Sequence, residues 1–518
     1  MIFAKIHDRC GAFLRDARKI FLLSLGVGIV LSIISILAIS DIYRDVANVY
    51  AYQARELGNG GFAAGWFGAV PMFSIVLAGG LVRLGMESYR ACVVISCLFY
   101  VLTLFPLRRY LERWLSPLAS SYGCLLFIIA PKVIRYSVSG LIDSTRYFFL
   151  IGALLFLFRL IEDPTWRRAV MFGLCSAGLA VSRGEGVVVS LILLSAFPLL
   201  AFLPRKNSGG RRPFPRYLAA AAVALVVFLV GTVPFCTVNW VKYNAFVTDT
   251  RLAGELSALK DKLCNHRTSE PPKADHNVPK EEKPSLPEQI WDCTNNSLIG
   301  GFELYWAFSL LGILTLLYRR KWNWEFSALL IAYLIHQSIY FSVSAAYRYS
   351  IYLVPMFMPF TVAGMTLCLE AYLHVRMSDR WRAILNTAWV AGALVAIVAF
   401  IDNGMQIVIS RSDNPKREAA AFIRNWGERN VSGRRLRIAD DGGYPEIVFW
   451  SGAYRVSGII HPNRWDECRD FDLILVGDPE LSAAKARNDL TFLNSFELGE
   501  DDRCHLFQAV PSAGKAQR

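Results

Sequence analysis

The chain has 518 residues, of which 54% are hydrophobic and only 19% are charged. Soluble domains carry about 25% charged residues, so this composition excludes an ordinary soluble enzyme. The net charge of +13 is not evidence for nucleic-acid binding, because the basic residues lie in short loops between apolar runs, as in membrane proteins.

Residues 1–19 are polar and mixed in charge, so the apolar run that follows lies too deep for an ordinary cleaved signal peptide. We therefore expect a retained first span. Further runs long enough to cross a bilayer as a helix recur along the chain. The apolar runs are 20–40, 68–86, 89–107, 117–133, 144–161, 168–182, 186–203, 216–236, 299–318, 325–343, 350–373 and 383–402.

Loop charge decides which runs cross. The basic loops are Arg108–Arg113, Arg167–Arg168, Arg205–Arg216, Arg319–Lys321 and Arg376–Arg382. If the run 68–86 crosses, all of these loops lie outside, contrary to the positive-inside rule; if it does not, all lie inside. We therefore predict about eleven spans, a cytoplasmic N-terminus, and a run at 68–86 that lies along the membrane in the first external loop.

Three large segments are then external. They are the first loop (41–88), a proline-rich long loop (238–298) and the tail (403–518), which follows a transmembrane domain over residues 1–402. The tail changes composition, and its pattern predicts a helix over 415–425 and a small α/β domain. The expected strands are LRIAD (436–440), EIVFW (446–450), DLILVG (472–477) and CHLFQAV (504–510).

Four cysteines lie in these external segments, two in the long loop and two in the tail. An external compartment permits disulfides, and the simplest pairing is Cys264–Cys293 and Cys468–Cys504. Four free thiols fit the sequence equally well. No C-x-x-C pair or histidine cluster predicts a structural zinc site.

Ionisable residues gather at the external ends of the spans, where charge close to lipid usually has a function. Carboxylates suit the deprotonation of a hydroxyl, and arginines suit a phosphate. The chain has no G-x-x-x-x-G-K-[ST] run, which disfavours an ATP-driven pump. The residues are Asp41, Arg44, Asp45 and Tyr50; Lys132, Arg135, Asp143 and Arg146; Arg183 and Glu185; and Arg348 and Tyr349.

Each residue also has a structural explanation. Basic residues at span ends often extend to lipid headgroups, acids at helix starts often cap the helix, and neighbours of opposite charge often pair. These explanations apply to Lys132 and Arg146, to Asp41 and Asp143, and to the pairs Arg44–Asp45 and Arg183–Glu185, respectively. The collection of these residues at one membrane face therefore supports a site, whereas no single residue does.

The order of these features resembles the GT-C superfamily of membrane glycosyltransferases, in the style of bacterial relatives of protein O-mannosyltransferases and of the lipid A aminoarabinose transferase. The resemblance covers roughly residues 18–375. It is carried by Arg44–Asp45 followed by Tyr50, Ala54, Leu57 and Gly60; by VPMFSIVLAGGLVRLG (70–85); by Asp143 after PKVIRYS (131–137); and by RYSIYLVP (348–355).

The resemblance implies inverting transfer of a sugar from a polyprenyl-phosphate donor to a lipid, glycan or protein acceptor. Asp45 would be the base and Asp41 the reserve, Asp143 would position sugar or acceptor, and Arg183 and Arg348 would hold the lipid phosphate. The usual family pattern has a second acid after the first, whereas Val46 follows Asp45, so the choice of base stays open.

The remaining candidates for substrate binding are Arg44, Tyr50, Lys132, Arg135, Glu185 and Tyr349. Superfamily members differ in their need for a divalent cation, so no cofactor is assigned and a metal stays open. We expect a bacterial inner-membrane protein with a periplasmic tail.

Three alternatives compete with this prediction. A lipid or polysaccharide flippase would have internal repeats and interrupted helices near the midplane, but no repeat is visible and His336 is the main ionisable residue within a span. A surface-polysaccharide polymerase or ligase would be another glycosyl transferase, and the long loop keeps that alternative open. A non-catalytic scaffold would leave the clustered acids and arginines unexplained.

Overall fold

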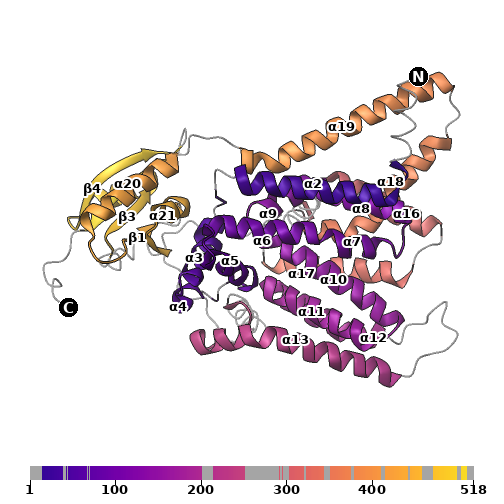
Figure 1. The fold of residues 1–518 in the computed structure, drawn as a ribbon, viewed down its shortest axis with the longest axis horizontal. Coiled ribbons are helices and arrows are strands. Elements are labelled where there is room, and N and C mark those ends of the chain that lie inside the picture. The colour runs from indigo at the N-terminus through magenta and orange to yellow at the C-terminus, as the bar shows by residue number, and fades with distance from the viewer. Residues whose placement is uncertain are drawn as a thin grey trace.

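The structure is a computed structural model in which helices form most of the chain and a small sheet lies near the C-terminus (Figure 1). It describes residues 14–38, 42–43, 45–66, 68, 70–200, 214–250, 291, 294–295, 303–319, 323–343, 351–374, 378–409, 415–440, 444–457, 471–498 and 503–509. The sequence prediction of a polytopic helical membrane protein with a small α/β domain is confirmed.

The apolar runs form the helices of the membrane part, most of which lie side by side in Figure 1. They are α2 (Ala17–Ala38), α6 (Ser88–Leu102), α7 (Leu104–Leu111), α8 (Pro117–Ile129), α9 (Pro131–Val138), α10 (Asp143–Glu162), α11 (Trp166–Ser182), α12 (Gly184–Leu200), α13 (Phe214–Tyr243), α16 (Glu303–Tyr318), α17 (Trp324–Val343), α18 (Leu353–His374) and α19 (Asp379–Ile409).

In the described part of the chain, six helical segments are long and apolar enough to cross a bilayer alone. The helices α8 and α9 are bent by 60° at their junction and would together make a seventh. Several other apolar helices, among them α12 and α16, are shorter. The predicted number of eleven spans therefore stays a prediction, although each of the eleven runs contains a helix.

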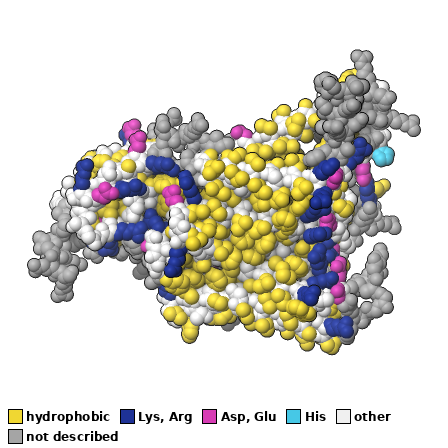
Figure 2. All heavy atoms as spheres, in the orientation of Figure 1, with side chains coloured by type: hydrophobic (Ala, Val, Ile, Leu, Met, Phe, Trp, Pro, Cys, Tyr) yellow, Lys and Arg dark blue, Asp and Glu magenta, His cyan; other side chains and the backbone are white. Residues whose placement is uncertain are grey.

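A broad apolar belt covers the face of the helical part that Figure 2 shows. On one side it ends at a row of basic and acidic side chains, and on the other it ends near the small sheet domain. The belt includes exposed leucines and valines of α2, α13 and α19. Lipid tails solvate such a surface, whereas the charged rows suit the headgroups and water.

The row of charges is called here the charged edge. Arg113 pairs with Glu162 (2.7 Å) and with Glu325, and these pairs join the loop after α7 to the end of α10 and to the start of α17. Arg319 at the end of α16 pairs with Glu370 near the end of α18. The described basic loops therefore lie at one edge. The positive-inside rule leads to this arrangement if the run 68–86 does not cross.

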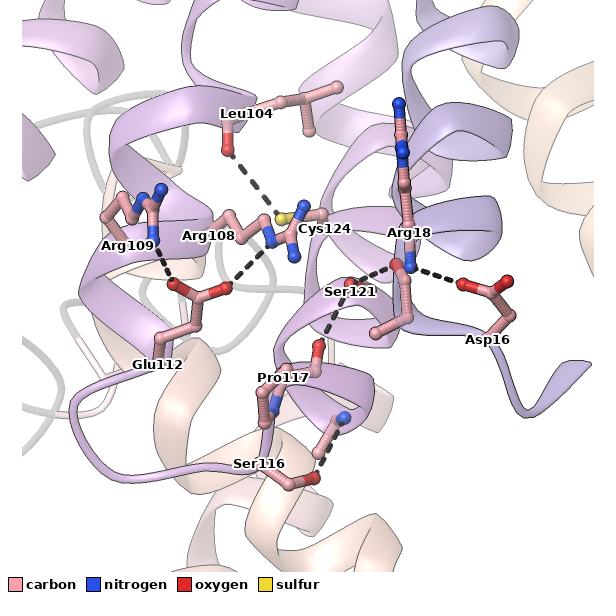
Figure 3. A network of polar contacts seen from close by, with 12 residues as sticks. Asp16, Arg18, Leu104, Arg108, Arg109, Glu112, Ser116, Pro117, Ser121 and Cys124 are labelled. Atoms are coloured by element: carbon pink, nitrogen blue, oxygen red, sulfur yellow. Dashed lines mark hydrogen bonds and ion pairs between the residues drawn. The ribbon is translucent and has the colours of Figure 1, made fainter.

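The start of α2 belongs to the same edge. The Ser121 hydroxyl on α8 donates to the carbonyl of Ala17 (2.7 Å), and Arg108 lies over the Phe21 ring. Figure 3 shows this region, with Arg108 and Arg109 both reaching Glu112. The N-terminal end of α2 therefore lies on the same side as the basic loops.

The first external loop forms a π-helix, η1 (Val46–Tyr50), and three helices, α3 (Ala51–Gly58), α4 (Phe62–Gly65) and α5 (Phe73–Arg83). The run 68–86 contributes only α5, which has 11 residues. At 1.5 Å per residue this helix is about 16 Å long, roughly half of a bilayer core. It packs against α3 and α6, in agreement with the prediction that this run does not cross.

The tail domain is defined here as residues 415–509. It contains a five-stranded sheet of order β2-β1-β3-β5-β4, in which β1 pairs parallel to β2 and β3, and β5 pairs antiparallel to β3 and β4. Its elements are α20 (Pro415–Asn430), β1 (Arg437–Asp440), α21 (Pro445–Ser451), β2 (Tyr454–Ser457), β3 (Leu473–Gly477), α22 (Asp478–Lys485), β4 (Leu490–Glu497) and β5 (Arg503–Ala509). The expected boundary at residue 403 falls within α19.

One strand prediction in the tail domain is wrong. Residues 446–450 form part of the helix α21, because Pro445 occupies the first turn and Gly452, with φ 77°, ends the helix in the left-handed conformation. A short apolar run buried on several sides has no periodicity that separates strand from helix. The prediction also missed β2, β4 and α22.

Candidate functional site

Four side chains at the ends of α10, α11 and α12 opposite the charged edge form the arginine–carboxylate cluster, defined as Asp143, Arg146, Arg183 and Glu185. Arg183 donates from Nη1 to Asp143 Oδ1 at 2.5 Å, and its Nε lies 2.9 Å from Glu185 Oε1. Arg146 Nη1 lies 3.0 Å from the same Glu185 oxygen. Residues far apart in the sequence thus form one continuous ionic chain.

The Asp143–Arg183 pair is the buried part of this cluster. Its side chains are only 2% and 7% exposed. Asp143 is the first residue of α10, whose N-cap is Ile142. Its carboxylate is neutralised by an arginine 40 residues away, as a buried charge requires.

Arg146 was expected to extend to headgroups, and this expectation is wrong. Its side chain is 3% exposed, and its guanidinium lies 3.8 Å from the centre of the Tyr352 ring. One helical turn separates Arg146 from Asp143, so both face the same side of α10. The sequence analysis counted Arg146 among the clustered ionisable residues without giving it a role, and it did not name Tyr352, although Tyr352 lies within the RYSIYLVP motif.

Glu185 is the most open member of the cluster. It is 34% exposed and bridges the two arginines, so the local ion pair with Arg183 considered from the sequence is present. Two arginines and two carboxylates balance in formal charge. Water or a polar ligand can therefore approach Glu185, whereas Asp143 is buried and paired with Arg183.

A third carboxylate, Asp249, lies against this cluster, and the sequence analysis missed it. It is buried, and its Oδ2 lies only 2.7 Å from the place where a Cβ on Gly184 would lie. Asp249 belongs to residues 244–250, called here the strap, which continues from α13. A single acid in a long polar loop gives no sequence signal, so only the fold could bring it here.

The strap is joined to the first external loop through Asn239 of α13. The Trp66 indole N–H donates to Asn239 Oδ1 (2.7 Å), and the Asn239 amide donates to the carbonyl of Val247 (2.8 Å). The Thr250 N–H also donates to the carbonyl of Gly68 (2.8 Å). These bonds fix the strap, and therefore Asp249, relative to the first loop.

Gly184→Ala tests this close approach. The added Cβ would force the buried Asp249 carboxylate to move, so we expect a loss of about 1–3 kcal/mol in the free energy of unfolding. Gly80→Ala is the matched control, because its Cβ would meet nothing within 4 Å. Thermal unfolding in detergent measures both, and equal midpoints for the two variants would contradict the packing.

Of the remaining predicted residues, some belong to the described part of the chain and others lie outside it. Asp45 is half-buried and directly precedes η1, and Tyr50 ends that π-helix with its side chain buried. Lys132 and Arg135 lie on α9, which the Tyr43–Tyr136 ring contact joins to the start of the first loop. Asp41, Arg44, Arg348 and Tyr349 lie outside the described residues, as do Cys264, Cys293 and Cys468 of the two predicted disulfides.

Arg135 differs from the two arginines of the arginine–carboxylate cluster. Its Nε is buried and has no hydrogen-bond partner in the described part of the chain. A buried donor without a partner is costly, so a ligand acceptor at this place would be stabilising. Among the described residues, no three His, Cys, Asp or Glu side chains come together to hold a metal ion.

Comparison with solved structures identifies the fold. ArnT from Cupriavidus metallidurans bound to undecaprenyl phosphate aligns with a TM-score of 0.54 and 13% identity, over 96% of this chain and 99% of that one. The oligosaccharyltransferase of Archaeoglobus fulgidus, tethered to an acceptor peptide, aligns with a TM-score of 0.51 and 11% identity, over 89% and 70%.

The arabinofuranosyltransferase AftD from Mycobacteria aligns with a TM-score of 0.51 and 13% identity, over 96% of this chain but only 40% of AftD. No family model and no curated protein sequence matches the chain. The chain therefore has a GT-C-like fold, as the resemblance in its sequence implied.

Proposed function

We propose that this protein is an inverting glycosyltransferase that moves a sugar from a polyprenyl-phosphate donor to an acceptor at the external face of the membrane. The observation that carries the proposal is the buried Asp143–Arg183 pair, set at the external ends of α10 and α11 in a GT-C-like fold. A structure of this fold with undecaprenyl phosphate supports the class of donor.

In the proposed reaction, an acceptor hydroxyl gives its proton to Asp45 while its oxygen attacks the anomeric carbon of the sugar. The bond between that carbon and the phosphate oxygen breaks, and polyprenyl phosphate leaves with the electron pair. Arg135 supplies a donor to the phosphate, and we assign the same role to Arg348. These positive charges stabilise the negative charge that develops on the leaving group.

The contacts change the role proposed for Arg183. Two carboxylates already hold its guanidinium, so we assign it to positioning Asp143 and Glu185 and not to binding the lipid phosphate. Asp143 and Glu185 would then orient hydroxyls of sugar or acceptor, with Glu185 the more accessible of the two. Arg146 keeps Glu185 in place from the other side.

The experiment that tests this function compares cell-envelope glycolipids and glycoproteins by mass analysis in a deletion strain. The strain is complemented with the wild-type chain or with Asp143→Asn. We expect one species to lose the mass of a single sugar in the deletion strain and in the variant. Identical profiles in all strains, with the wild-type protein present in the membrane, would remove the proposal.

The orientation is also proposed, with the charged edge in the cytoplasm and the tail domain outside, because the basic loops share that edge. A phosphatase reporter that is active only outside the cytoplasm should be inactive when fused after Asp163 and active when fused after Gly85. Activity after Asp163 together with inactivity after Gly85 would contradict the proposed topology, because either a reversed orientation or a crossing run 68–86 gives that pattern.

A further inference from the structure

An ionic contact joins the tail domain to the first external loop. Arg435 donates from Nη1 to Glu56 Oε1 of α3 at 2.7 Å, although the two residues are 379 positions apart. Arg55, next to Glu56, donates to the carbonyls of Phe449 (3.4 Å) and Ala453 (3.5 Å). Both charges of α3 are therefore engaged by the tail domain.

The element that makes this contact is α21. Its Phe449 is buried with the helical core and not with the core of the tail domain. The neighbouring Trp450 meets Tyr89, at the start of α6, edge to face with ring centres 5.1 Å apart. One short helix of the tail domain thus inserts aromatic side chains between the first loop and α6.

The segment beside α21 is the one that carries Asp45. The helix α21 packs directly on η1, and Val46 and Ala47, which follow Asp45, are buried in the same core as Phe449. A π-helix is a rare element that is frequently found at functional sites. The helix α21 is one of the elements that pack against η1 and hold it in place.

The interface is polar. Arg55 Nε, Gln53 Oε1 and Trp450 Nε1 are buried without a hydrogen-bond partner in the described part of the chain. Burial, and then the positive charge of Arg435, lower the pKa of Arg55, whereas Glu56 opposes this effect. Because Glu56 lies between the two arginines, its charge is what allows them to lie close together.

We propose that the tail domain is a positioning element of the transfer site, in which α21, held on α3 by the Glu56–Arg435 pair, fixes the π-helix that follows Asp45. This inference rests on the proposed function. Arg435 and Glu56 are positioning residues, since neither touches substrate. The tail domain would then act on the rate of the chemical step and not on capture of the donor.

The test is Arg435→Glu in the full-length protein, with Arg429→Glu as the control. Arg429 is exposed on α20 and carries the same charge change without the contact. Arg435→Glu places a second carboxylate beside Glu56. We therefore expect kcat to fall about tenfold, whereas KM for a polyprenyl-phosphate sugar should stay unchanged. The reciprocal variant, Glu56→Arg with Arg435→Glu, should regain most of the lost rate.

Hydrogen–deuterium exchange gives a second readout that needs no catalysis. Arg435→Glu should speed the exchange of amides in η1 and α3, and the reciprocal variant should slow it again. Faster exchange with unchanged kcat would overturn the positioning role, and unchanged exchange would overturn the docking contact. If the wild-type protein transfers no sugar while the exchange results hold, the proposed function fails and the docking contact stands.

Discussion

Arg183→Met is expected to lower the free energy of unfolding by about 3–5 kcal/mol and to reduce sugar transfer by at least about 100-fold. The substitution leaves the buried Asp143 carboxylate without its partner, and it removes one of the two arginines that hold Glu185. Unfolding in detergent and a transfer assay measure the two effects separately.

Arg319→Met is the matched control for Arg183→Met. It removes an arginine from the exposed Glu370 pair at the charged edge, where we expect the free energy of unfolding to stay close to that of the wild-type protein, because water screens the interaction.

The double variant Arg183→Met with Asp143→Asn separates stability from function. Removing both charges avoids a lone buried carboxylate, so we expect most of the lost stability to return. Transfer should stay low, because the carboxylate that orients the substrate is gone. A double variant with normal transfer would show that the pair has a purely structural role.

Asp45→Asn is expected to lower transfer by about 10²–10⁴-fold, the contribution typical of a general base. Asparagine keeps the size of the side chain but cannot accept the proton of an attacking hydroxyl. Because Asp45 is only half-buried, the midpoint of thermal unfolding should stay close to that of the wild-type protein. A transfer assay with membranes that contain equal amounts of protein gives the comparison.

Asp16→Asn is the control for Asp45→Asn. Asp16 is an acid at the charged edge, where it accepts the N–H groups of Arg18 and Lys19, far from the proposed site. It should transfer at the wild-type rate. Full activity of Asp45→Asn would remove this residue from the mechanism and assign the base to Asp41.

Much of the membrane part could be predicted from the sequence because lipid makes the local pattern decisive. Each apolar run contains a helix, since a backbone surrounded by lipid must satisfy its hydrogen bonds internally. Loop charge also predicted that Arg113, Arg168 and Arg319 lie at one edge and that the run 68–86 does not cross, and the only helix described in that run, α5, has 11 residues.

The tail domain was less predictable. Residues 437–440 form a strand as expected, but 446–450 form a helix, because their side chains are buried by two different cores, one of them the helical part. A short apolar run does not reveal which neighbours will bury it.

The positions of the apolar runs and of the basic loops predicted which residues lie together at the helix ends, and they were enough to name Asp143, Arg183 and Glu185. The partners of these residues depend on the tertiary structure. The burial of Arg146 against Tyr352, the pairing of Asp143 with Arg183, and the approach of Asp249 to Gly184 all join separate segments. Helix periodicity and loop charge act over a few turns, whereas these contacts depend on how helices pack, which is set by side-chain shape across the whole bundle.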